Sequence, residues 1–152
     1  MTLRAKAATG RASSVYGIDA SPEMVEVARQ KAQQHGLDIT FQVDLIERLS
    51  FPDASFDVIF SSLMMHHLPG DLKRRGLEEM RRVLKPGGRL VIVDFRRPTN
   101  WFFKAFLALM FHGGLRQGVE DLVPLVQQAG FSAIEEGVLT PTTIGFVRAV
   151  AG

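Results

Sequence analysis

Strand-like and helix-like segments alternate along most of this chain, and this alternation limits the fold more than any other feature. Each expected strand is short, apolar and followed by turn residues or a helix start. The expected strands are 14–18, 39–43, 56–60 and 89–95, and the expected helices are 2–8, 21–35 and 72–84. This order predicts an α/β fold with a mostly parallel sheet.

Turn and capping residues set the helix boundaries. Ser21 is a good N-cap, Pro22 suits the first helical position and Glu23 places an acid in the first turn. Gly36 suits the position just after a helix end. The triplet 86–88, Pro-Gly-Gly, ends the helix that precedes the strand at 89–95.

The last third of the chain predicts two more helices and an antiparallel pair of strands. The helices are expected at 101–111 and 120–129, with Pro124 tolerated in a first turn. The strands are expected at 132–138 and 143–149, joined by a turn around 140–141, at one edge of the sheet. We expect a single domain over residues 1–152.

Composition excludes several classes of protein. The 152 residues suffice for one domain, and a hydrophobic content of 46% is ordinary for a globular chain. A formal charge of +2 argues against nucleic acid as a partner, because such proteins carry concentrated positive charge. With no cysteine, a charged N-terminus and no apolar run near 20 residues, we expect a cytoplasmic protein without a membrane span.

Four motifs occur in register over residues 1–95. They are Tyr-Gly-Ile-Asp-Ala-Ser-Pro-Glu-Met at 16–24, Val-Asp-Leu at 43–45 with the run 49–57, the segment 61–68, and Arg-Val-Leu-Lys-Pro-Gly-Gly-Arg-Leu-Val-Ile at 82–92. Together they resemble class I S-adenosylmethionine-dependent methyltransferases of type 11, and more loosely the C-methyltransferases of quinone biosynthesis. The resemblance implies a Rossmann-like sheet, S-adenosylmethionine as cofactor and methyl transfer to a small, lipophilic acceptor.

The resemblance also implies a set of cofactor-binding residues. An acid at the end of a strand beside a helix start suits the ribose hydroxyls, which implicates Asp19. Ala20 and Met24 would pack beside it. Asp44 would accept from the adenine amino group, and Leu45 would give a backbone contact. Near the methionine end of the cofactor we expect Ser61 and Ser62.

The chain departs from the family pattern at its beginning. The family's first strand and glycine-rich loop precede the helix at 2–8, and this sequence contains neither. The strand is central in the family's sheet, so we expect a rearranged sheet, a homodimer or poor solubility. A non-catalytic fragment or pseudo-enzyme acting as a subunit is the alternative function.

No catalytic residue stands out, apart from the candidate His66. A methyl on a sulfonium is already activated, so proximity and alignment are the main needs. His66 is open to a structural role or to a role at the active-site mouth. Adjacent residues of an extended chain point to opposite faces, so we expect no metal site at His66 and His67.

Two further segments admit simple interpretations. The basic residues of 73–85 predict a solvated helix face, with Glu78 and Arg82 as an i,i+4 ion pair. The apolar segment 101–111 is open to burial in the core or to a lid over a greasy acceptor, with peripheral membrane contact.

Overall fold

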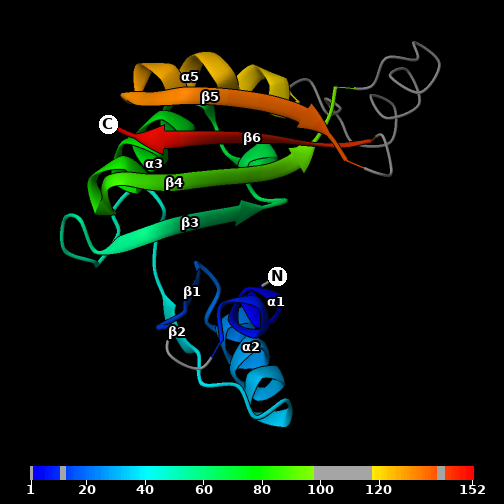
Figure 1. The fold of residues 1–152 in the computed structure, drawn as a ribbon. Coiled ribbons are helices and arrows are strands. Elements are labelled where there is room, and N and C mark those ends of the chain that lie inside the picture. Colours follow the sequence, from blue (N-terminus) through cyan, green and yellow to red (C-terminus); the bar gives the residue numbers. More distant parts are fainter. Residues whose placement is uncertain (1, 11–12, 98–117, 140–142) are drawn as a thin grey trace. The chain divides into compact units, whose positions relative to one another are not determined.

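A computed structural model describes residues 2–10, 13–97, 118–139 and 143–152 (Figure 1). The chain divides into two compact units, residues 1–50 and 51–152. Each unit is described by itself. The expected helix at 101–111 and the expected turn at 140–141 lie outside the described residues.

The first unit pairs two short parallel strands with two helices. Its elements are α1 (Thr2–Thr9), β1 (Tyr16–Asp19), α2 (Pro22–Gln34) and β2 (Thr40–Val43). In the β1–β2 register, Gly17 lies opposite Phe41. Phe41 packs with Val25 and Ala32 of α2, and these buried side chains form the core of the unit.

Local capping holds α2 as the sequence predicts. The Ser21 hydroxyl accepts a hydrogen bond from the Met24 amide at 3.2 Å, and Pro22 opens the helix. Gly36 follows the helix end with φ +61°, which glycine adopts without strain. Because α2 begins at Pro22, Asp19 at the end of β1 lies directly before the first turn of the helix.

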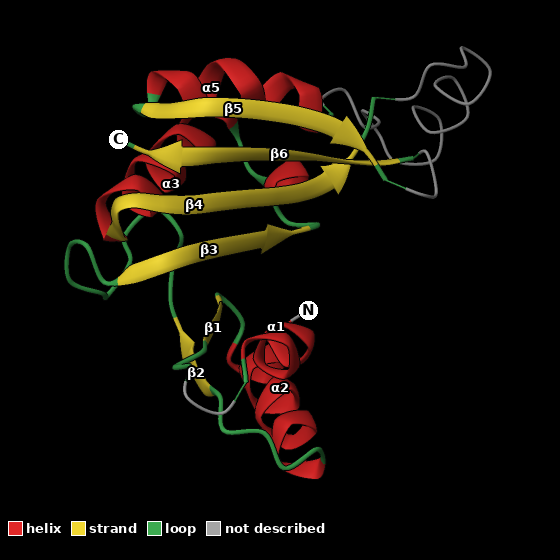
Figure 2. Cartoon of the chain, viewed as in Figure 1, coloured by secondary structure: helices red, strands yellow, loops and turns green. Residues whose placement is uncertain are grey.

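The second unit is a four-stranded sheet with helices packed on it. Its elements are β3 (Phe56–Ser62), η1 (Met65–His67), α3 (Gly70–Val83), β4 (Leu84–Phe95), η2 (Val119–Leu122), α5 (Val123–Gln128), β5 (Phe131–Val138) and β6 (Ile144–Ala151). The strand order is β3-β4-β6-β5. Three strands run one way and β6 runs against them (Figure 2). The α/β fold with an antiparallel C-terminal pair is thereby confirmed.

The core of the second unit lies between this sheet and the helices α3 and α5, which contact each other. Its buried side chains include Leu77, Met80, Val83, Leu84, Leu90, Ile92, Val126 and Val147. Pro124 occupies the first turn of α5, as expected. The strand β4 begins at Leu84, five residues earlier than expected, because Leu84 pairs with Phe56 before the register shifts at Val58.

Among the described residues, β1, β2, β3 and β5 each have one hydrogen-bonded partner strand, which for β3 is β4. Apolar side chains on β3 are exposed, including Val58 at 56% and Phe60 at 43%. Exposed apolar side chains on an edge strand favour association with another strand.

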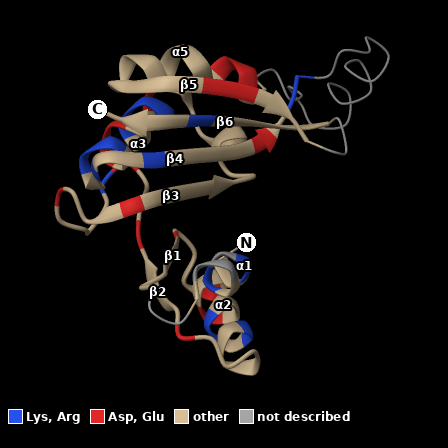
Figure 3. Cartoon of the chain, in the orientation of Figure 1, with Lys and Arg blue, Asp and Glu red and all other residues tan. Residues whose placement is uncertain are grey.

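The helix α3 carries much of the unit's positive charge (Figure 3). The predicted ion pair between Glu78 and Arg82 is wrong. Arg82 instead binds Glu79 and Asp53, each at 2.7 Å, because its guanidinium reaches the turn before β3. Glu78 faces Arg74.

Candidate functional site

Two predicted cofactor residues lie side by side at the carboxyl ends of β1 and β2. Asp19 ends β1, and Asp44 directly follows β2. The Asp44 amide donates to the Asp19 carbonyl at 3.1 Å, which continues the parallel pairing by one residue. Ligands of open parallel sheets bind at this end of the strands.

The Asp19 side chain is exposed and only partly engaged. Its Oδ1 accepts a hydrogen bond from the Ser21 amide at 2.9 Å. Its Oδ2 accepts none from the described residues. One oxygen therefore fixes the side chain, while the other can accept from a ribose hydroxyl.

The Asp44 side chain is buried, with 8% exposed, and it is fully engaged by its neighbours. Oδ1 accepts from the Leu45 amide at 3.0 Å and the Ser50 hydroxyl at 3.2 Å. Oδ2 accepts from the Ser50 amide at 2.9 Å and Gln42 at 3.2 Å. These four donors occupy the lone pairs of the carboxylate, so Asp44 closes the loop 44–50.

The remaining predicted residues of the first unit present apolar surface beside the two acids. Ala20 is exposed, and the side chains of Met24 and Leu45 are 54% and 50% exposed. The Leu45 amide, expected to contact adenine, donates instead to Asp44. Ala20, Met24 and Leu45 can therefore contact a ligand through their exposed apolar side chains.

Ser61 and Ser62 end β3 in the second unit, paired with Ile92 and Val93 of β4. The Ser61 hydroxyl is buried and has no hydrogen-bond partner among the described residues. A buried hydroxyl without a partner carries a desolvation cost that a bound polar ligand would remove.

His66 follows β3 in η1, a single 3-10 turn. The expectation that residues 66 and 67 are extended, with side chains on opposite faces, is wrong. The turn brings the His66 and His67 rings to 3.8 Å between centroids. Phe95 meets the His66 ring edge-on at 5.0 Å.

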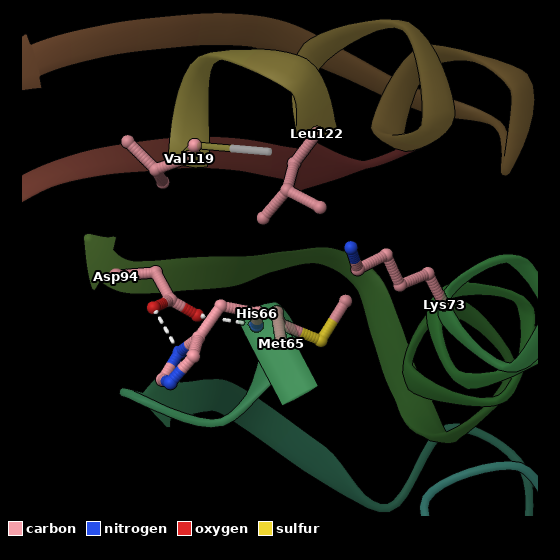
Figure 4. Close-up of a pocket in the computed structure, with 7 residues that line it drawn as sticks. Met65, His66, Lys73, Asp94, Val119 and Leu122 are labelled. Carbon is pink, nitrogen blue, oxygen red and sulfur yellow. Dashed lines mark hydrogen bonds and ion pairs between the residues drawn. The ribbon is translucent and has the colours of Figure 1, made fainter. Parts of the chain in front are cut away.

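A buried acid, Asp94, holds His66 in place (Figure 4). Its side chain is 2% exposed, near the carboxyl end of β4. Oδ1 lies 2.6 Å from Nδ1 of His66, and Oδ2 accepts the His66 amide at 3.1 Å. The Phe95 amide also donates to Oδ1, at 2.7 Å.

His66 and Asp94 line a small pocket together with Lys73. The other lining residues are Met65, Gly118, Val119 and Leu122. The cavity volume that the centre of a water molecule can occupy is about 10 Å³, so the pocket has room for one water molecule. Lys73 is 3% exposed, so the expected solvated face does not include it. Burial lowers the pKa of Lys73, and the negative charges of Asp94 and Asp121 oppose that shift.

The η2 side of the pocket is held to the end of β4 by two ion pairs. Arg96 binds Glu120 at 2.8 Å, and Arg97 binds Asp121. Asp121 also accepts the Gly118 amide at 2.8 Å. These contacts keep Val119 and Leu122 over the pocket.

Sequence reasoning missed Asp94 and Lys73. Asp94 had a visible signal, since it is the one acid in the apolar run 90–95 and lies at the carboxyl end of a strand. Lys73 had none, because it is one of several basic residues on α3. Of the predicted residues, the structure brings Asp19 and Asp44 together in one unit and places Ser61, Ser62 and His66 in the other.

A family described as methyltransferase domain matches residues 2–92. A demethylmenaquinone methyltransferase of Deinococcus radiodurans is 40% identical over 97 residues, which are 64% of this chain and 39% of the relative. An uncharacterized methyltransferase of Synechocystis is 30% identical over 145 residues, covering 91% of this chain and 66% of the relative. The chain thus spans less than two thirds of either relative.

A crystal structure of a methyltransferase from Methanosarcina mazei superposes with a TM-score of 0.72 at 24% identity. The match covers 90% of this chain and 81% of that one, and it supports the fold alone. Among the described residues, no helix is both long and apolar enough to cross a membrane.

Proposed function

Since the chain belongs to the class I S-adenosylmethionine-dependent methyltransferase family, we propose that it binds S-adenosylmethionine and transfers its methyl group to a small, lipophilic acceptor. The observation that carries the proposal is the exposed Asp19 carboxylate at the carboxyl end of β1, with one oxygen open to a ligand. We further propose that the two units form one methyltransferase domain, which the family match supports because it includes residues of both.

The residues present fit the cofactor unequally. Asp19 would accept from the ribose hydroxyls, while Ala20, Met24 and Leu45 would give apolar contact. Asp44 would shape the loop, and it would contact an adenine amino group only by exchanging a longer bond, such as that of Gln42 at 3.2 Å.

In the second unit, Ser61 and Ser62 would meet the methionine end of the cofactor. The Ser61 hydroxyl supports this assignment because it is buried with no partner among the described residues. The cofactor, when bound, supplies a methyl carbon already activated by the sulfonium. The protein's own contribution is to hold the acceptor in line with it and exclude water.

The lipophilic acceptor rests on the relatives. The Deinococcus relative is a demethylmenaquinone methyltransferase, and menaquinones are apolar. The apolar segment 101–111 would supply a lid or a peripheral membrane contact. A homodimer through β3 would cover Val58 and Phe60, while a cytoplasmic location remains a prediction from the sequence.

The test is calorimetric titration of the purified chain with S-adenosylhomocysteine, the product form of the cofactor. We expect saturable micromolar binding. Asp19→Ala should weaken it about 10- to 100-fold, the effect of losing hydrogen bonds to a charged group. The matched control is Asp38→Ala, which removes an exposed aspartate before β2 and should bind as the wild type does.

A folded chain that does not bind would favour the alternative, a non-catalytic subunit or fragment. Equal binding by Asp19→Ala and the wild type would remove Asp19 from the site. Analytical ultracentrifugation of the same sample measures its oligomeric state.

A further inference from the structure

The contact between Asp94 and His66 fixes the position of the His66 ring and also which ring nitrogen carries the hydrogen. Asp94 takes three hydrogen bonds, two from backbone amides and one from the His66 ring. The two amides are donors only, one on each oxygen of the carboxylate. The orientation of the carboxylate is therefore set by the backbone before the ring is considered.

The ring nitrogen that faces Asp94 must carry the hydrogen. An ionised carboxylate only accepts hydrogen bonds, and Asp94 already accepts two of them from backbone amides. Nδ1 of His66 is then the donor, and Nε2 is left with a lone pair. Nε2 has no hydrogen-bond partner among the described residues.

The surroundings leave the ring little freedom to turn away. His66 exposes 14% of its side chain, and the rings of Phe95 and His67 contact it. His66 lies in η1, shortly after the carboxyl end of β3, and contacts Asp94 near the carboxyl end of β4. A buried acid that orients a histidine with one free nitrogen is the arrangement that general-base catalysis uses.

We propose that Asp94 is a positioning residue that holds His66 with Nε2 unprotonated, and that Nε2 accepts the proton of the methyl acceptor. This rests on the proposed methyltransferase function. The need for a base also defines the class of methyl acceptor. An amine with a free lone pair can be methylated without a base, so a base indicates an acceptor that must lose a proton. The acceptor is a hydroxyl or an acidic carbon.

The proton and electron balance is simple. The acceptor atom gives the electron pair of its bond to hydrogen to the methyl carbon, and its proton moves to Nε2 of His66. The carbon–sulfur bond breaks with its pair left on sulfur, giving S-adenosylhomocysteine. The imidazolium returns its proton to solvent, so no oxidant or reductant is needed.

The first measurement is made on the chain alone, without an acceptor. Two-dimensional ¹⁵N NMR at about pH 8, where histidine is ordinarily neutral, reports which ring nitrogen holds the hydrogen. We expect Nδ1–H for His66 and a mixture for the exposed His67. In Asp94→Asn the new amide group would face a backbone donor on either side, so the ring should lose its single form. Asp57→Asn, an exposed aspartate paired with Lys85, is the control.

The second measurement is methylation of 1,4-dihydroxynaphthalene, which offers hydroxyls and acidic ring carbons, compared with benzylamine. We expect His66→Gln to lower kcat on the naphthalene about 10²- to 10⁴-fold with little change in KM. His35→Gln, at an exposed histidine of the first unit, should behave as the wild type does. Imidazole in the buffer should partly restore His66→Ala, which a purely structural role would not allow.

The outcomes separate the two proposals. An Nε2–H ring, a ring form unchanged in Asp94→Asn, or full kcat in His66→Gln would overturn the role of the pair. Preference for benzylamine would overturn the acceptor class. A chain that binds no S-adenosylhomocysteine would contradict the proposed function. The NMR measurement would still show which nitrogen of His66 carries the hydrogen. Circular dichroism confirms that each variant is folded.

Discussion

Among single residues, Asp121 links η2 to both β4 and the buried Lys73. Its carboxylate binds the Arg97 guanidinium and the Gly118 amide, and its charge acts on buried Lys73. The hydrogen bond from Arg97 is the main reason that the pKa of Asp121 lies below its ordinary 3.8. The folded protein therefore holds a proton on this group less readily than the unfolded chain does.

That difference predicts a pH-dependent contribution to stability. It is fully present above pH 3.8 and is lost as pH falls below that value through the folded pKa. Asp121→Asn should therefore lower the free energy of unfolding at pH 7, and its difference from the wild type should shrink as the pH falls below 3.8. Urea unfolding across this range measures it. In an Arg97→Met background the Asp121→Asn effect should be much smaller, and an undiminished effect would contradict the assigned cause.

Elements were predictable where their signals are local. Ser21, Pro22 and Gly36 fix both ends of α2 by contacts within a few residues, so the sequence alone places that helix. The contact between His66 and Asp94 spans 28 residues, and nothing near either residue announces it. The same holds for Lys73, whose burial depends on η2, and for the start of β4, which depends on pairing with β3.

The pairing of β1 with β2 also depends on a contact that the sequence hides. A Cβ atom added at Gly17 would lie 2.5 Å from the Phe41 ring, which is confined by Val25 and Ala32. Gly17→Ala should therefore lower the free energy of unfolding by about 1–3 kcal/mol. Gly70→Ala is the matched control, since a Cβ there meets nothing within 4 Å. Urea unfolding compares the two, and equal stability of both variants would refute the close packing.

At the scale of the whole molecule, the two units differ in how much they bury. The first unit has a core of three buried side chains, and its strands have one partner strand each among the described residues. In the second unit, β4 and β6 each pair on both sides, over a larger set of fully buried side chains. A larger core and two-sided pairing stabilise backbone hydrogen bonds against local opening.

Amide hydrogen exchange should therefore proceed in a fixed order. The amides of 16–19 and 40–43 should exchange first, through local opening, while those of 90–93 and 145–149 should exchange last, at the free energy of global unfolding. Mass spectrometry of peptic fragments, compared with urea unfolding, measures both levels. Val25→Ala, which enlarges the space beside Phe41, should speed exchange in the first group, whereas Leu139→Ala, at a site 39% exposed, should leave it unchanged. A single rate for both groups would mean that the chain opens as one cooperative body, and would contradict the difference in core size as the cause.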